Sequence, residues 1–241
     1  MGKKKNIAKT NISFQMAKQG IYARFFKRGI DLILSLAALV ILSPILLILM
    51  ICGTVAMKGN PFFVQERPGK NEKIFKLIKF RTMTSQKDAE GNLLPDEKRL
   101  TAYGNFLRST SLDELPELFN IFTGKLAICG PRPLLTDYLD QYDERQRHRH
   151  DVRPGLTGYA QIHGRNALSW EERFDLDLWY VNHITFLTDL KIVLQTIRIV
   201  LKREGISSET SVTMEKFQGN KRRSEEQGKK EAEGEREDGH E

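Results

Sequence analysis

Two adjacent carboxylates are the side chains of this chain that could most directly do chemistry. Asp113 and Glu114 lie between Ser111 and Pro116, and a helix tolerates a proline only near its start. A helix N-terminus carries free N–H groups and partial positive charge, which keep a carboxylate ionised and attract phosphate. One carboxylate could attack a phosphorus atom while its neighbour holds a divalent metal ion. The spacing Ser111-x-x-Glu114 also matches a capping box, an ordinary helix start with no chemistry.

Basic and acidic residues on predicted turns supply further candidates. In the segment 130–133, Gly-Pro-Arg-Pro, two prolines restrict the backbone around Arg132, which suits bidentate binding of phosphate. Arg153 opens the glycine-rich segment 153–158, where glycine would let the backbone approach a ligand closely. Alone, each segment is equally compatible with a surface turn. Asp189 begins the last predicted helix, where an N-cap or first-turn acid is the simpler interpretation.

Three more cations lie on or beside a predicted β-hairpin. Residues 62–65 and 73–80 predict two short strands, and they flank the turn residues 68–71, Pro-Gly-Lys-Asn. Arg67 precedes this turn, and Lys79 and Arg81 lie on the second strand and at its end. They form either a solvated basic face or a surface for lipid headgroups.

One long apolar run, residues 32–56, must position these groups relative to a membrane. Roughly 25 residues at about 1.5 Å each would cross a hydrocarbon core about 30 Å thick. Basic residues lie on both sides of the run, however, and short basic segments stay on the cytoplasmic side. Pro44 removes a helical hydrogen bond and Ser43 can bond back to its own helix, so we expect a kink there. The pattern predicts a re-entrant helix; a straight transmembrane helix with a tolerated proline is the alternative, and a signal peptide is excluded.

The rest of the chain predicts an α-rich α+β protein: one kinked re-entrant membrane helix and a small cytosolic helical domain with a short β-hairpin. Residues 84–98 are polar and predict a loop. The predicted parts are a flexible basic stub (1–20), the membrane helix with the segment leading into it (21–58), a catalytic domain (59–218) and a disordered charged tail (219–241). The predicted helices of the domain cover residues 99–122, 134–150, 170–183 and 189–203.

Composition excludes several functional classes. The 241 residues carry a formal net charge of +7, which suits anionic lipid, nucleic acid or phosphorylated small molecules. No nucleic-acid-binding motif is present, and the membrane segment favours lipid. Cys52 and Cys129 have no disulfide or zinc spacing, and we expect both to be small buried apolar residues. The five histidines lack the spacing of a helical metal motif.

Taken together, these segments resemble the bacterial sugar transferase family, the small monotopic phosphoglycosyl transferases. The matching segments are, in order, 27–31 (KRGID), 43–44 (SP), 65–69 (QERPG), 79–83 (KFRTM), 111–116 (SLDELP), 130–133 (GPRP), 153–158 (RPGLTG) and 189–191 (DLK). Each segment is weak evidence, but their shared order from about residue 24 to about residue 217 is specific. Cys129 stands where the family usually has a Val-like residue, and the tail has no family counterpart to compare.

The resemblance implies a definite reaction. Members of the family move a sugar phosphate from a UDP-sugar to undecaprenyl phosphate and release UMP. By this resemblance Asp113 attacks the β-phosphate to form a covalent aspartyl–phosphosugar intermediate, and Glu114 binds Mg²⁺. The residues implied to bind substrate phosphate are Arg67, Lys79, Arg81, Arg108, Arg132 and Arg153, with the late acid Asp189.

The resemblance also implies a place and a set of partners. We expect the cytoplasmic membrane of a bacterium, with the catalytic domain and both termini on the cytoplasmic face. The implied partners are the UDP-sugar, undecaprenyl phosphate and membrane lipid, with no nucleic acid; a homo-oligomer or an association with later glycosyltransferases is left open. The similarity to short members implies a minimal single-domain form and an acetylated amino sugar as donor. The competing hypothesis is a non-catalytic membrane-surface protein that binds lipid or a partner and does not need Asp113; direct transfer without a covalent intermediate is a third.

Overall fold

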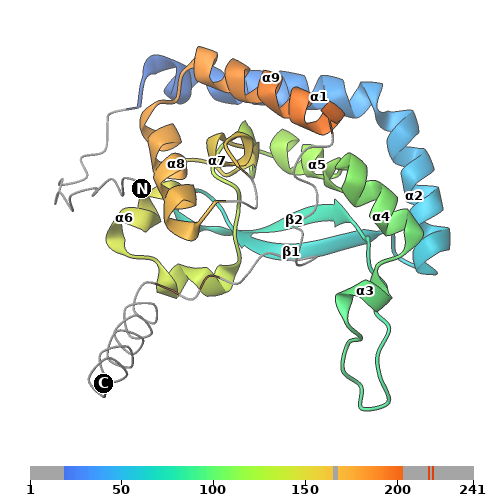
Figure 1. The fold of residues 1–241 in the computed structure, drawn as a ribbon. Coiled ribbons are helices and arrows are strands. Elements are labelled where there is room, and N and C mark those ends of the chain that lie inside the picture. Colours follow the sequence, from blue (N-terminus) through green and yellow to red (C-terminus); the bar gives the residue numbers. More distant parts are fainter. Residues whose placement is uncertain (1–18, 165–167, 203–216, 218, 220–241) are drawn as a thin grey trace, which may run out of the picture.

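The computed structural model describes residues 19–164, 168–202, 217 and 219. Helices dominate, and α1 and α9 lie along one edge, with α5 and α7 between that edge and the β1–β2 hairpin (Figure 1). The elements are η1 (Tyr22–Phe26), α1 (Lys27–Ile41), α2 (Ser43–Met57), β1 (Phe62–Pro68), η2 (Lys70–Glu72), β2 (Ile74–Phe80), α3 (Asp96–Arg99), α4 (Ala102–Thr110), η3 (Leu112–Glu114), α5 (Glu117–Phe122), β3 (Ala127–Cys129), η4 (Thr136–Gln141), α6 (Glu144–Arg147), η5 (His148–His150), β4 (Gly155–Thr157), α7 (Tyr159–Ile162), α8 (Trp170–Asn182) and α9 (Phe186–Lys202). This helix-rich fold with a short β-hairpin confirms that part of the predicted class.

The structure describes only some of the parts into which the sequence analysis divides the chain. The basic stub 1–20 and the charged tail 219–241 lie outside the described residues, apart from positions 19, 20 and 219. Position 203, the predicted end of the last helix, also lies outside them. The domain boundaries therefore stay predictions.

The apolar run folds as two helices that meet at a sharp bend. Pro44 has no N–H to donate to the carbonyl oxygen of Val40, and Ser43 Oγ donates to that oxygen instead, at 2.8 Å. Leu42 separates the helices with φ −89° and ψ 0°. The segments Tyr22–Ile41 and Ser43–Met57 are bent by 64°. Among the described helices none is long and apolar enough by itself to cross a bilayer, but this bent pair passes the same test together.

One stripe of α1 is polar and buried against the rest of the protein. Lys27, Asp31 and Ser35 recur every four residues and are all buried. The Asp31 carboxylate accepts a hydrogen bond from the backbone N–H of Ile128 at 3.2 Å, although burial raises its pKa. This hydrogen bond links the first turns of α1 to β3.

Both strands of the predicted hairpin are present and antiparallel, with Phe62 opposite Phe80 and Glu66 opposite Lys76. A second, parallel pair, β3 with β4, was not predicted, because each strand has only three residues. Its glycines serve chain packing. A Cβ on Gly155 would lie 2.1 Å from Gly130 N, and a Cβ on Gly158 would lie 2.2 Å from Gly130 O. The sequence analysis expected these glycines to let a ligand approach the backbone closely. In the structure it is another segment of the backbone, at Gly130, that approaches them.

The predicted helix 134–150 is broken in the structure. It forms η4, α6 and η5, and Tyr142 between the first two is extended, with φ −73° and ψ 137°. This conformation turns the Tyr142 ring into an aromatic cluster with Phe174 and Phe217, at centroid distances of 5.5 and 5.9 Å. Asp143 then caps α6 through a capping box with Gln146. Tertiary burial of one aromatic ring overrides the local helical pattern.

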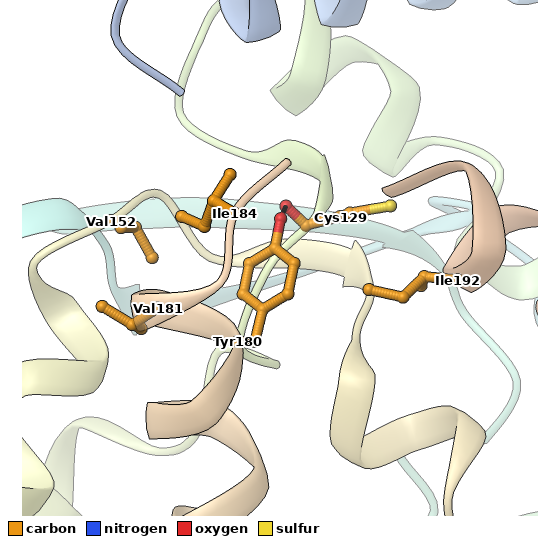
Figure 2. Packing of buried hydrophobic residues seen from close by; sticks show 6 residues of the cluster. All are labelled: Cys129, Val152, Tyr180, Val181, Ile184 and Ile192. Carbon is orange, nitrogen blue, oxygen red and sulfur yellow. Dashed lines mark hydrogen bonds between the residues drawn. The ribbon is translucent and has the colours of Figure 1, made fainter. Parts of the chain in front are cut away.

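The core beneath α9 joins β3, α8 and α9. Figure 2 shows Tyr180 among Val152, Val181, Ile184 and Ile192, with its hydroxyl donating to the backbone oxygen of Cys129 at 2.9 Å. Cys129 is buried as expected. Cys52 is exposed on α2, so the expectation that it is covered by the protein was wrong.

His150 makes the stability of the fold depend on pH. Its ring is 4 % exposed, and Nε2 has no hydrogen-bond partner within the described residues. Burial, and then the charge of Arg149, lower the pKa of His150 to about 3. The unfolded chain takes up a proton below about pH 6.5, whereas the folded protein does not until about pH 3. Stability from this group is therefore complete above about pH 6.5 and is lost as the pH falls.

We expect His150→Gln to weaken this pH dependence. Between pH 7.5 and pH 5 the wild-type protein should lose about 2 kcal/mol more stability than the variant, at about 1.4 kcal/mol per pH unit below 6.5. Melting temperatures of both proteins in detergent at the two pH values measure the difference. Equal shifts in the two proteins would show that His150 does not stay neutral.

Candidate active site

The two carboxylates lie in a tight reversal between α4 and α5. Ser111 ends α4 in the left-handed region, with φ 57°, and Leu112–Glu114 form a single 3-10 turn. Pro116 precedes the first residue of α5, where its missing N–H is tolerated. The Ser111 side chain makes no capping bond; only its backbone oxygen accepts from Glu114 N, at 3.3 Å. The capping-box interpretation of Ser111-x-x-Glu114 was therefore wrong.

Glu114 is bound by two cations from different parts of the chain. Its Oε1 accepts from Lys79 Nζ of β2 at 2.7 Å and from Arg132 Nη2 at 2.6 Å. Arg132 projects from the Gly-Pro-Arg-Pro segment, whose prolines limit its freedom. Burial alone would raise the pKa of Glu114, but Arg132 and Lys79 outweigh it and hold this pKa well below its usual range. Glu114 is consequently ionised at neutral pH.

Asp113 is the freer of the two carboxylates. Across the described residues, no side chain or N–H donates a hydrogen bond to its carboxylate, which is half-buried. Burial, and then the charge of Glu114, raise the pKa of Asp113 to about 6, while Lys79, Arg132 and Arg108 oppose the rise. At neutral pH it is therefore an ionised carboxylate near three cations with its oxygens unoccupied, as an attacking group requires.

A third carboxylate, Glu117, was missed by the sequence analysis. It is 3 % exposed and lies 3.1 Å from Lys79 Nζ. Burial, and then Glu114, raise the pKa of Glu117 to about 7. Its position three residues after Glu114 was the available signal, since that spacing brings helical side chains to one face.

A polar cavity of about 220 Å³ opens beside Asp113 and Glu114, here called the dyad, and several charged side chains line it. Four charged residues, Arg67, Lys79, Glu117 and Arg132, are among its lining residues. Arg67 Nη2 donates to Gln65 Oε1 at 2.7 Å. Two aromatic rings and a third arginine also line it, namely Tyr138, Trp170 and Arg173. This cavity can accept an anionic ligand with an aromatic part.

Arg108 approaches the dyad from α4. Its Nε donates to Thr82 Oγ1 at 3.1 Å, which fixes the guanidinium beside Asp113. With Lys79 and Arg132, it makes three predicted phosphate-binding cations at Asp113 and Glu114, and a fourth, Arg67, lines the polar cavity with Lys79 and Arg132.

Of the other three predicted phosphate-binding residues, Arg153 and Asp189 do not line the polar cavity. Asp189 accepts from Lys27 Nζ at 2.5 Å, Tyr180 at 2.7 Å and Tyr22 at 2.9 Å, which joins η1, α1, α8 and α9. Arg153 faces Asp31 and lines a separate basic cavity of about 320 Å³ with Arg24, Lys27, Arg28 and Lys70. The backbone N–H of Arg81 donates to Pro61 O, at 2.7 Å. Roles for Arg81, Arg153 and Asp189 toward substrate phosphate stay predictions.

The dyad fits a divalent metal shared with a substrate. No cluster of three metal-binding side chains occurs in the described ranges. Mg²⁺ usually takes one or two carboxylates and completes its shell with phosphate oxygens and water, so such a cluster is not required. Glu114 stays ionised, and both of its hydrogen bonds fall on Oε1, which leaves Oε2 for a metal ion.

Comparisons with known proteins show the family of the chain. The family model of the bacterial sugar transferases matches residues 22–203. The chain is 52 % identical over 195 residues to the uncharacterized sugar transferase EpsL of Bacillus subtilis, covering 80 % of this chain and 96 % of EpsL.

Two further relatives have longer chains. The undecaprenyl-phosphate galactose phosphotransferase of Salmonella typhimurium is 35 % identical over 201 residues, 76 % of this chain and 42 % of that one. The UDP-N-acetylgalactosamine-undecaprenyl-phosphate N-acetylgalactosaminephosphotransferase of Aeromonas hydrophila is 34 % identical over 193 residues, 77 % of this chain and 45 % of that one. The match thus spans less than half of these two relatives. The extent of the family match and the identity to EpsL show that the chain belongs to the bacterial sugar transferase family.

Proposed function

We propose that this protein transfers a sugar 1-phosphate from a UDP-sugar to undecaprenyl phosphate and releases UMP. This would be the first membrane step in the synthesis of a polysaccharide or other glycoconjugate. The names of the Salmonella and Aeromonas relatives support the acceptor and the type of reaction. The observation that carries the proposal for this chain is the pairing of an unoccupied carboxylate, Asp113, with an anchored one, Glu114.

The proposed reaction proceeds in two displacements at the same phosphorus. Asp113 attacks the β-phosphorus of the donor, the bond from that phosphorus to the bridging oxygen breaks, and UMP leaves with the oxygen. An oxygen of undecaprenyl phosphate then attacks the aspartyl–phosphosugar. The acyl-phosphate bond breaks, which releases the lipid-linked diphosphosugar and restores the Asp113 carboxylate.

The surrounding charges suit this chemistry. A carboxylate and a diphosphate repel each other, so cations must lower the negative charge where they meet. Lys79, Arg108 and Arg132 surround Asp113, and Arg67 lines the cavity where the diphosphate would lie. A Mg²⁺ ion held by Glu114 would neutralise charge on the diphosphate and its leaving group.

Fewer observations support the identity of the sugar in the donor. We propose an N-acetylated amino sugar, on the resemblance to short family members and the name of the Aeromonas relative. The Salmonella relative is named for galactose, so a panel of donors must decide.

The proposed location is the cytoplasmic face of the bacterial membrane, with α1 and α2 as a re-entrant pair. The 64° bend at Leu42 supports it, as do the exposed apolar side chains along α2, such as Leu47, Ile48 and Val55. A re-entrant pair would keep the basic residues on both sides of the run in the cytoplasm.

The test uses purified full-length protein in detergent with undecaprenyl phosphate, Mg²⁺ and a panel of UDP-sugars. We expect UMP and lipid-linked sugar in equal amounts with at least one donor. EDTA should abolish both products, and added Mg²⁺ should restore them. A protein that yields no UMP with any donor would instead fit the alternative, a non-catalytic membrane-surface protein.

A further inference from the structure

A second cavity, the apolar pocket, reaches Glu114 of the dyad and is separate from the polar cavity. It measures about 400 Å³ and lies between the C-terminal end of α1 and one face of α9, over α5 and the β3–β4 pair. Ala38 and Leu42 form one wall, and Val193, Ile197 and Val200 form the other. In Figure 1 these two helices run along the same edge of the molecule.

The dyad lies between the two cavities. Ser111, Leu112 and Glu114 line one end of the apolar pocket. Glu114 is also bound by Lys79 and Arg132, which line the polar cavity. The two cavities share no lining residue. Glu114 therefore lines the apolar pocket and is also bonded to two charged side chains of the polar cavity.

The walls of the apolar pocket suit a hydrocarbon chain. Val193, Ile197 and Val200 recur at helical spacing and are all aliphatic. Three threonines line the pocket, and the hydroxyl of each has a partner within the protein: Thr157 Oγ1 and Thr196 Oγ1 lie 2.7 Å apart, and Thr110 Oγ1 donates to the backbone oxygen of Phe106 at 2.8 Å. No lysine or arginine is among the lining residues. A nucleotide would find no partner for its phosphates there.

The outer end of the pocket continues onto exposed apolar surface. Leu42 and Val200 line the pocket, while their neighbours Ile41 and Leu201 are 73 % and 78 % exposed. Exposed aliphatic residues next to a pocket mark a path by which a lipid chain can enter from a bilayer.

We propose that the apolar pocket binds the isoprenoid units next to the phosphate of the acceptor lipid, so that this phosphate lies at Asp113. The inference rests on the proposed function, and it assigns the acceptor to the α1–α9 side and the donor to the polar cavity. In this arrangement the hydrocarbon chain of the acceptor lies on the α1–α9 side, while its phosphate enters the position that UMP has left, in line with the bond from phosphorus to Asp113.

Bulky substitutions on the pocket face of α9 test the inference. In Ile197→Trp the added ring should fill the pocket and raise the KM for undecaprenyl phosphate about tenfold or more, with the KM for the UDP-sugar within twofold of wild type. Val200→Phe is a second variant in case the first is poorly folded. Leu194→Phe is the control on the same helix, because Leu194 is exposed and does not line the pocket.

The outcomes separate this inference from the proposed function. Wild-type protein that makes no lipid-linked product refutes the proposed function. Active wild type together with an unchanged acceptor KM in both pocket variants overturns the inference alone. An equal rise in donor and acceptor KM, or the same rise in Leu194→Phe, overturns it as well. Photocrosslinking with a diazirine in the first isoprenoid units should label residues 193–200, and labelling confined to the lining of the polar cavity would contradict it.

Discussion

Replacing Asp113 with asparagine should reduce sugar-phosphate transfer by about 10³-fold or more and leave the fold intact. The amide has nearly the shape of the carboxylate but cannot serve as a nucleophile, and loss of a covalent nucleophile is among the largest single effects in enzymes. Within the described structure the Asp113 carboxylate accepts no hydrogen bond that the amide would lose. UMP release and lipid-linked product, measured with the best donor, give the fold-change.

The stability of this variant should move in the opposite direction to its activity. Burial raises the pKa of Asp113 to about 6, so the charged carboxylate is disfavoured in the folded state at neutral pH. Asp113→Asn removes that charge, and we expect a melting temperature equal to or above that of wild type. Glu114→Gln is a poorer probe, because it would weaken the bonds to Lys79 and Arg132.

Two controls complete this experiment. Asp137→Asn changes a carboxylate on η4 outside both cavities and should keep full activity. Wild-type protein with labelled donor and no acceptor should yield a phosphosugar adduct on the peptide that contains Asp113. Retained transfer in Asp113→Asn would remove Asp113 as nucleophile; loss of transfer with no adduct would favour direct attack by the acceptor.

Local chemistry made part of this site predictable. The bend at Leu42 depends on Pro44 and Ser43 alone, both of which are visible in the sequence. The hairpin follows from two short segments rich in Phe, Ile and Val around a Pro-Gly turn. The prolines on both sides of Arg132 restrict its backbone. Its availability to a ligand could therefore be expected from the sequence, before its partner Glu114 was known.

The remaining features depend on contacts between distant segments. Nothing near Asp189 indicates that Lys27, 162 positions earlier, will pair with it. The β3–β4 pair exists because Gly130 and Gly155 touch backbone to backbone, a contact without a local pattern. Tyr142 interrupts a segment with a helical pattern because its ring packs against Phe174 and Phe217. In the sequence, Glu117 is indistinguishable from an ordinary acid in the first turn of a helix. Only the structure shows that Lys79 lies beside it.

Removing Asp177 should destabilise the protein by about 3–5 kcal/mol, because it leaves a buried guanidinium without its counter-charge. Both Arg149 and Asp177 side chains are 2 % exposed, and Arg149 Nη2 lies 2.6 Å from Asp177 Oδ2. At roughly 2–4 °C per kcal/mol for a chain of this size, Asp177→Ala should lower the melting temperature by about 6–20 °C. Asp175→Ala is the control on the same helix: its pair with Arg145 is more than half exposed and should contribute at most about 1 kcal/mol.

The same pair also reaches the active site, and a double variant separates the two roles. Arg149 Nη2 donates to the backbone oxygen of Arg132 at 2.8 Å, and Arg132 in turn binds Glu114. Arg149→Met with Asp177→Leu replaces the buried pair by apolar side chains, which often restores stability. It cannot restore the donor to Arg132. We therefore expect the double variant to melt near wild type yet to transfer sugar phosphate more slowly. Full activity in the double variant would show that Arg149 only stabilises the fold, and a melting temperature of Asp177→Ala within about 2 °C of wild type would contradict the stabilising role itself.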